Sequence, residues 1–216
     1  MSSASSRTAI LNRIKVGLNA TEDNRAELCA AEWQELPRHY RRFGQLEEPE
    51  LIALFDSRLQ HYNGTPFYSE GTVREDIARV LAQRGKRVLI VPPAFPHEWR
   101  PSGFMFVPDE NLTKEQLDLN DGVVTTCALG IALTGTVVLE SSREQGRRAA
   151  TLIPDYHLCV LRREDIVHFV PEAIRKLEAS KDLPLTFFSG PSATVDIEMT
   201  RVRGVHGPRT LDVLIV

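Results

Sequence analysis

Short apolar runs separated by polar, helix-type stretches dominate the chain from about residue 64 onward. Four of these runs predict strands, at residues 87–91, 158–161, 185–188 and 212–216. Continuous runs of β-branched and leucine side chains are typical of parallel strands buried on both faces. A helical pattern at residues 72–84 precedes the first run, and a helix followed by a buried strand is the α/β pattern. We therefore predict an α/β fold with a mainly parallel sheet flanked by helices, in which all four runs share one sheet.

The first 63 residues have a different pattern, with helix-type apolar spacing in two segments, Ser5–Leu18 and Leu46–Tyr62. The polar stretch between them, Ala26–Phe43, is either an ordered lid or a mobile arm, and packing of such an arm on a second subunit of a homo-oligomer is left open. We predict an N-terminal helical extension over residues 1–63 and an α/β domain over residues 64–216.

Polar, glycine-containing loops border the last two predicted strands. Ser189–Thr194 follows one strand and leads into a pattern that predicts a helix starting at Ser192 or Thr194. Gly204–Arg209 precedes the final strand. Backbone N–H groups at a helix N-terminus bind phosphates and carboxylates. We predict that an anionic small molecule binds where Gly135–Thr136, Ser189–Thr194 and His206 converge, at the carboxyl edge of the sheet. The predicted ligand-binding residues are Gly135, Thr136, Ser189, Gly190, Ser192, Thr194 and His206.

The same loops have a purely structural interpretation. Asp196 and Glu198 fall in the first turn of the predicted helix, where their carboxylates would satisfy the positive end of its dipole without a ligand. His206 is either a structural histidine or a ligand donor and general acid/base near neutral pH. No catalytic residue is assigned.

A second loop of interest follows residues 87–91 and is rich in aromatic side chains, among them Phe95 and Trp99. Ligands of open α/β sheets bind at the carboxyl ends of strands. The aromatic side chains of this loop therefore either contact a ligand, or Trp99 and Phe104 merely cap the core.

Composition and motifs exclude several classes of protein. A net charge of −3 gives no reason to expect nucleic-acid binding, and no apolar run approaches the length of a membrane span. Three scattered cysteines, Cys29, Cys127 and Cys159, predict no disulfide framework and a cytoplasmic location, and they cannot supply a four-thiolate iron–sulfur site. No histidine spacing suggests a metal site. Gly-x-Ser-x-Gly, Gly-x-Gly-x-x-Gly and Walker motifs do not occur.

The paired loops, Ser189–Glu198 and Gly204–Arg209, together with Leu133–Leu139, resemble the lactate utilisation protein C family, also called the LUD domain. The resemblance covers about residues 65 to 216 and implies a fold like that of the ribose-phosphate isomerase, glucosamine-phosphate deaminase and CoA-transferase group. It also implies a role in oxidising L-lactate to pyruvate with two iron–sulfur-associated partner proteins, in which this chain is the subunit without a cluster. Family members commonly have an acidic residue where this chain has Leu133, and leucine can neither bind substrate through charge nor orient a base.

Three hypotheses about function follow. The chain is a subunit or accessory protein of a lactate-oxidising system, whose iron–sulfur clusters belong to partner subunits. Alternatively, it is a stand-alone enzyme acting on a sugar phosphate, an acyl-CoA or a folate-like anion, or it is a regulatory module that senses a carboxylate.

Overall fold

The computed structural model describes residues 3–17, 25–195, 201–203 and 207–216, and divides into two compact units, Met1–Tyr40 and Arg41–Val216. The described residues of the first unit form the helices α1 (Ser3–Gly17) and α2 (Arg25–Glu35). The first of these confirms the helix predicted at Ser5–Leu18. The second lies in the stretch whose character the sequence left open.

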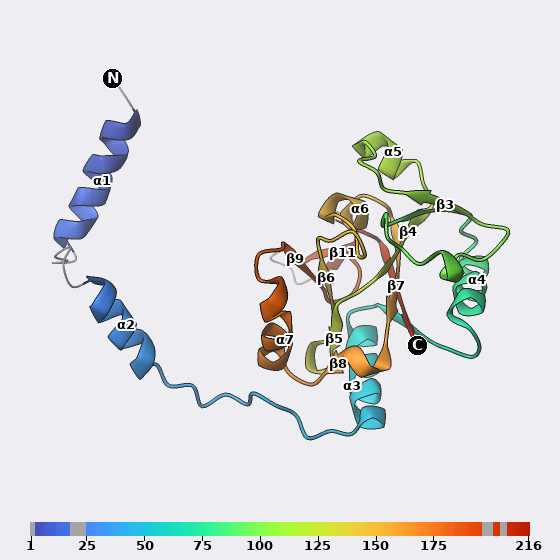
Figure 1. Cartoon of the computed structure of the whole chain (residues 1–216), viewed down its shortest axis with the longest axis horizontal. Helices are drawn as coiled ribbons and strands as arrows, with labels where there is room; N and C mark the ends of the chain where they lie inside the picture. The colour runs from blue at the N-terminus through green and yellow to red at the C-terminus, as the bar shows by residue number, and fades with distance from the viewer. Residues whose placement is uncertain (1–2, 18–24, 196–200, 204–206) are drawn as a thin grey trace. The chain divides into compact units, whose positions relative to one another are not determined.

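The second unit is built on a six-stranded sheet in which every neighbouring pair is parallel. Its strands, in spatial order, are β1 (Thr65–Tyr68), β12 (Thr210–Ile215), β7 (Tyr156–Leu161), β4 (Gly122–Thr126), β2 (Val88–Val91) and β3 (Met105–Pro108) (Figure 1). From β2 the chain goes outward to β3, whereas from β4 it continues in the opposite direction to β7 and β12. The point where the strand order reverses therefore lies between β2 and β4.

Burial along these strands explains the continuous apolar runs. In β7, Leu158 and Val160 pack in one core cluster, whereas Cys159 and Leu161 pack in another. Successive side chains of a strand point to opposite faces, so both faces of the sheet are buried. The predicted α/β class with a mainly parallel sheet flanked by helices is confirmed.

A second, four-stranded sheet has the order β8 (Ile166–Val167), β5 (Leu129–Ile131), β6 (Thr136–Glu140) and β9 (Leu185–Phe188). Strand β9 pairs antiparallel with β6. The prediction that residues 185–188 share a sheet with the other three runs is therefore wrong. The run is only partly buried, and Phe187 is 44% exposed. An apolar run predicts a strand but does not specify the strand with which it pairs.

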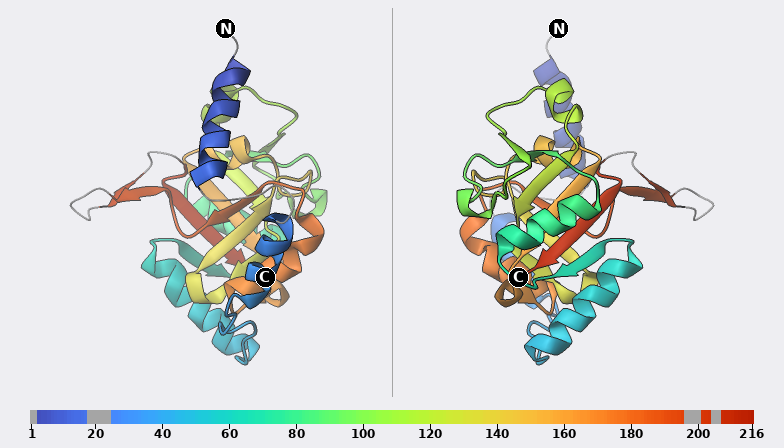
Figure 2. Two further views of the ribbon diagram at one scale, coloured as in Figure 1. Left: turned by 90° about the vertical axis from the view of Figure 1, so that its left-hand side faces the viewer. Right: turned by 90° about the vertical axis from the view of Figure 1, so that its right-hand side faces the viewer.

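Two long helices cover opposite faces of the parallel sheet. Helix α4 (Val73–Gln83) begins with a capping box at Thr72 and packs on one face, as the right-hand view of Figure 2 shows. Helix α3 (Glu48–His61) packs on the other face together with the second sheet, where Phe55 and Leu59 are fully buried. Because α3 contributes to this core, it belongs to the compact unit that begins at Arg41, although the sequence pattern placed the boundary after residue 63.

The remaining elements are short. They are η1 (His97–Trp99), α5 (Lys114–Asp118), η2 (Ala132–Thr134), α6 (Arg148–Leu152), η3 (Arg163–Asp165), α7 (Val170–Lys176), η4 (Leu177–Ser180), β10 (Ala193–Val195) and β11 (Arg201–Arg203). Within the described parts of the chain, no helix is long and apolar enough to cross a membrane.

The last two of these strands correct the predicted helix. Strands β10 and β11 pair antiparallel, with Thr194 opposite Val202, and Figure 2 shows them projecting from the α/β unit. A helix starting at Ser192 or Thr194 is therefore wrong. Serine and threonine are favourable N-cap residues, but they also occur in turns, and β-branched residues such as Thr194 and Val195 favour a strand.

Candidate functional site

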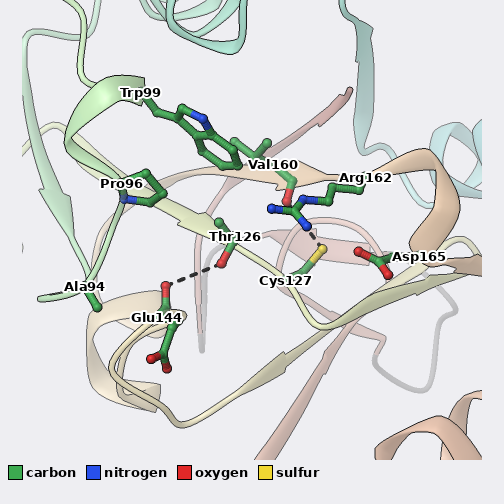
Figure 3. A pocket seen from close by; sticks show the side chains of 9 residues that line it. All are labelled: Ala94, Pro96, Trp99, Thr126, Cys127, Glu144, Val160, Arg162 and Asp165. Carbon is green, nitrogen blue, oxygen red and sulfur yellow. Dashed lines mark hydrogen bonds between the residues drawn. The ribbon is translucent and has the colours of Figure 1, made fainter.

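A cavity of about 240 Å³ opens at the carboxyl edge of the parallel sheet, at the point where the strand order reverses. We call it the switch-point cavity. Its lining residues come from the chain after β2 (Ala94, Pro96, Trp99), from the end of β4 (Thr126, Cys127), from the end of β7 and the turn after it (Val160, Arg162, Asp165), and from the loop after β6 (Glu144) (Figure 3). This is the usual position for a ligand in an open α/β sheet.

The loop after β2, which forms one wall of the cavity, is held in place by the buried side chain of Phe95 and by a hydrogen bond to its backbone. Phe95 is 1% exposed and lies in the core, and its carbonyl oxygen accepts a hydrogen bond from Nη2 of Arg100 at 2.7 Å. The rings of Phe95 and Trp99 meet edge to face, with centroids 6.0 Å apart. Trp99 and Phe104 pack against the core cluster that contains Phe95, so the loop caps the core. Trp99 also lines the cavity, and its contact with a ligand stays a prediction.

The floor of the cavity contains neutral polar groups that already have partners. Thr126 Oγ1 donates to the carbonyl oxygen of Glu144 at 3.4 Å, and Cys127 Sγ donates to that of Val160 at 3.5 Å (Figure 3). The hydrogen bond with Cys159, followed by burial, raises the pKa of the Cys127 thiol well above its usual value. Cys127 therefore remains a protonated thiol at neutral pH, and it is unsuited to act as a thiolate nucleophile.

Unlike the polar groups of the floor, two charged side chains of the cavity have no partner among the described residues. Arg162 and Asp165 are three residues apart, at the start and end of the turn that follows β7. In the part of the chain that the structure describes, neither side chain forms a hydrogen bond or an ion pair. Arg162 is exposed and Asp165 is half-buried. The cavity therefore combines a cation and an anion that both remain available to a ligand.

A neighbouring hollow of about 520 Å³ lies beyond the loop after β6 and is also charged. There, however, Arg147 binds both carboxylate oxygens of Asp109, at 2.7 and 2.9 Å. That bidentate pair satisfies the two groups within the protein.

Among the described residues, the ligand-binding residues predicted from the sequence do not line the switch-point cavity. Thr136 Oγ1 lies 2.6 Å from Ser189 Oγ, so the structure brings these two hydroxyls together. Gly135 and Gly190, with φ of +57° and +83°, pack against the C-terminal end of α3. A Cβ atom on either one would overlap the backbone there, at Leu59 and at Tyr62. The two glycines therefore meet the carbonyl end of a helix, where the dipole disfavours anions.

Ser192 lies near the start of β12. The backbone N–H of Ser192 donates to the carbonyl oxygen of Pro208 at 2.8 Å, two residues before that strand. This position is the amino edge of the parallel sheet, so the predicted convergence at the carboxyl edge is wrong for Ser192. Thr194 lies in β10, and His206 lies outside the described residues. Whether any of the seven residues binds a ligand stays a prediction.

Sequence reasoning missed Arg162 and Asp165, although a signal was present. Arg162 comes directly after the predicted strand at residues 158–161, as the aromatic loop comes directly after residues 87–91. The same rule about carboxyl ends of parallel strands could have identified it. That the two strand ends lie close together required the sheet order.

The fold and the position of the cavity define an α/β protein with a parallel sheet and a cavity at its switch point. The LUD domain family model matches residues 96–216. "Lactate utilization protein C" of Deinococcus radiodurans is 41% identical over 175 residues, which span 79% of this chain and 82% of the relative. The protein of the same name from Anoxybacillus flavithermus is 26% identical, over 93% of this chain and 94% of the relative.

A crystal structure of a DUF162 family protein from Deinococcus radiodurans superimposes with a TM-score of 0.69 and 35% sequence identity. The match covers 80% of this chain and 99% of the solved one. The chain belongs to the LUD domain family, and the resemblance inferred from its loops is confirmed.

Proposed function

We propose that this chain is a subunit of a system that oxidises L-lactate to pyruvate, and that partner proteins carry the iron–sulfur clusters of that system. The observation that supports this role is the 41% identity to a lactate utilization protein C along 82% of that relative. The switch-point cavity supports it independently, because it offers a small acid the guanidinium of Arg162, which is unpaired among the described residues.

The size of the cavity favours this role over an enzyme acting on acyl-CoA or a folate. Pockets for drug-sized ligands usually measure about 300 to 1,000 Å³. The switch-point cavity, at about 240 Å³, suits a molecule with only a few heavy atoms.

The cysteines support the assignment of the clusters to partner proteins. The whole sequence contains three cysteines, and all three are free thiols. A cubane or rhombic cluster usually needs four thiolates. Free thiols also support a reducing, cytoplasmic location.

The proposal is tested by complementation in a strain of Deinococcus radiodurans from which the gene for its lactate utilization protein C has been deleted. Expression of this chain should restore growth on L-lactate as the sole carbon source, compared with an empty vector. Growth on glucose serves as the control and should not change. Unrestored growth on lactate, despite normal amounts of folded protein, would contradict the proposed role.

The cluster assignment has a separate test. We expect the chain purified alone under anaerobic conditions to contain no stoichiometric iron or acid-labile sulfide, and to oxidise lactate only when iron–sulfur partner proteins are added. Stoichiometric iron and sulfide in the isolated chain would contradict the assignment of clusters to partners.

A further inference from the structure

We propose that the switch-point cavity binds a short carboxylic acid with a hydrogen-bond donor on carbon 2, whose carboxylate pairs with Arg162 and whose donor contacts Asp165. The shared chemistry fits a 2-hydroxy acid or a 2-amino acid. The choice of the hydroxy acid rests on the proposed function.

Arg162 is suited to the carboxylate because its guanidinium has no partner among the described residues. Figure 3 shows the guanidinium turned back over the cavity, toward Cys127. A guanidinium presents its donors in a planar fork that matches a carboxylate. In the neighbouring hollow, Arg147 is held by Asp109, so this arginine does not compete for the ligand.

Asp165 determines what the ligand carries next to its carboxylate. An ionised carboxylate only accepts hydrogen bonds. A hydroxyl or ammonium group on carbon 2 can donate to it, whereas the oxygen of a 2-oxo acid would place one acceptor against another. The cavity should therefore discriminate lactate from pyruvate, although the two differ by only two hydrogen atoms.

The opposite wall is suited to the short carbon chain of such an acid. Figure 3 shows Trp99 and Pro96 on one side and the charged pair on the other, with Val160 beside Arg162. The second acidic residue of the lining, Glu144, contributes its backbone carbonyl to the floor, and Figure 3 shows its carboxylate directed away from Arg162. The repulsion of an incoming anion by Glu144 is thereby reduced.

Trp99 provides a direct signal for binding. The chain contains two tryptophans, and a Trp33→Phe variant leaves Trp99 as the single one. The full-length variant is titrated with L-lactate, L-alanine, pyruvate and propionate while tryptophan fluorescence is recorded, and isothermal titration calorimetry repeats each titration. We expect L-lactate to bind at least tenfold more tightly than pyruvate or propionate. Equal binding of all four acids, or no binding of any, would overturn the proposal.

Two substitutions separate the roles of the charged pair. Arg162→Gln should weaken lactate binding about tenfold to a hundredfold, because a hydrogen bond to a charged group is lost. Asp165→Asn should bring lactate and pyruvate to within about threefold of each other, because an amide can donate as well as accept. Arg148→Gln and Glu164→Gln make the same chemical changes at exposed positions outside the cavity and should leave binding unchanged. Equal effects at both sets of positions would contradict the assignment.

The results also separate this inference from the proposed function. Selective binding of L-alanine without L-lactate would support the cavity chemistry and contradict the lactate role. Restored growth on lactate by both the native chain and the Arg162→Gln variant would support the lactate role and contradict the cavity assignment.

Discussion

At the scale of single residues, the buried carboxylate of Asp212 joins two elements through its hydrogen bonds. It is fully buried in β12 and accepts bonds of 2.7 Å from both Nε and Nη2 of Arg84. The Tyr156 hydroxyl donates to it at 2.9 Å. The hydrogen bonds with Asp212 raise the pKa of Arg84 above its ordinary value. Because Arg84 caps the end of α4, this cluster joins that helix to the sheet.

Replacing Asp212 by asparagine should lower the free energy of unfolding by about 3 to 5 kcal/mol, because it leaves the arginine without its counter-charge. Urea denaturation monitored by circular dichroism measures the change. Asp118→Asn makes the same substitution at an exposed position and should change the stability by less than about 0.5 kcal/mol. Similar losses in the two variants would show that the buried pair has no special role.

A second buried residue, His157, makes stability depend on pH. Its Nε2 lies 2.8 Å from Thr125 Oγ1, and burial lowers the pKa of His157 from 6.5 to about 3. Between these values the unfolded chain binds a proton that the folded chain does not bind. Stability therefore falls as the pH decreases below about 6.5.

Denaturant titrations between pH 5 and pH 8 should show this fall, with a contribution on the order of 1 kcal/mol per pH unit in the acidic half of the range. The variant His157→Gln keeps a polar group beside Thr125 but cannot titrate. In this variant, the slope of the unfolding free energy against pH should decrease by the amount that one bound proton contributes. The two proteins should have the same slope above pH 7.5. Identical slopes at pH 5 to 6 would contradict the assignment to His157.

Among the elements, the packing of α3 against the second sheet depends on a close backbone approach at Gly135. This residue has φ of +57°, and a Cβ atom would overlap the backbone nitrogen of Leu59. Gly85, which follows α4, has a similar φ of +65°, but a Cβ atom there would meet no heavy atom of the described residues within 4 Å. The two glycines therefore share a positive φ and differ in the space around them.

This pair predicts a difference between two alanine variants. Gly85→Ala should cost about 1 kcal/mol through backbone strain alone. Gly135→Ala should cost about 3 kcal/mol, because α3 must also move away from the turn. In a protein of this size, that difference corresponds to a gap of about 4 to 8 °C in Tm, measured by thermal unfolding. Equal Tm values of the two alanine variants would show that α3 can move away from residue 135 at little cost in free energy.

On the scale of the whole molecule, the core extends to a helix that the sequence assigned to the N-terminal extension. Phe55 and Leu59 of α3 are fully buried beside Val213 and Phe188, which belong to the two different sheets. Truncating a buried leucine or phenylalanine to alanine usually costs about 2 to 5 kcal/mol. Two such anchors are a large share of the stability of a typical domain.

Two truncations test this boundary. A fragment of residues 41–216 should unfold cooperatively, with a free energy of unfolding within about 1 kcal/mol of that of the full chain. A fragment of residues 64–216 lacks α3 and should fail to show a cooperative transition. Circular dichroism and denaturant titration of both fragments provide the measurement. Cooperative folding of the shorter fragment would support the predicted boundary at residue 63.

The sequence by itself determined the local structure of this protein. The buried run at residues 87–91 predicted β2, and the helical pattern at residues 72–84 predicted α4, whose end at Gly85 has the expected positive φ. These signals depend on residues a few positions apart, so they can be found without knowing the fold. The paired loops were also sufficient to indicate the LUD family, which the match to the family model confirms.

Only the tertiary structure decided which strands pair and where the cavity lies. The pairing of β9 with β6, and the placing of Trp99 and Arg162 in the lining of one cavity, both depend on chain segments far apart in the sequence. A strand carries the same apolar pattern whichever partner it has, because the pattern records burial and not the identity of the neighbour. The switch-point cavity exists because the strand order reverses between β2 and β4, and that order belongs to the sheet as a whole.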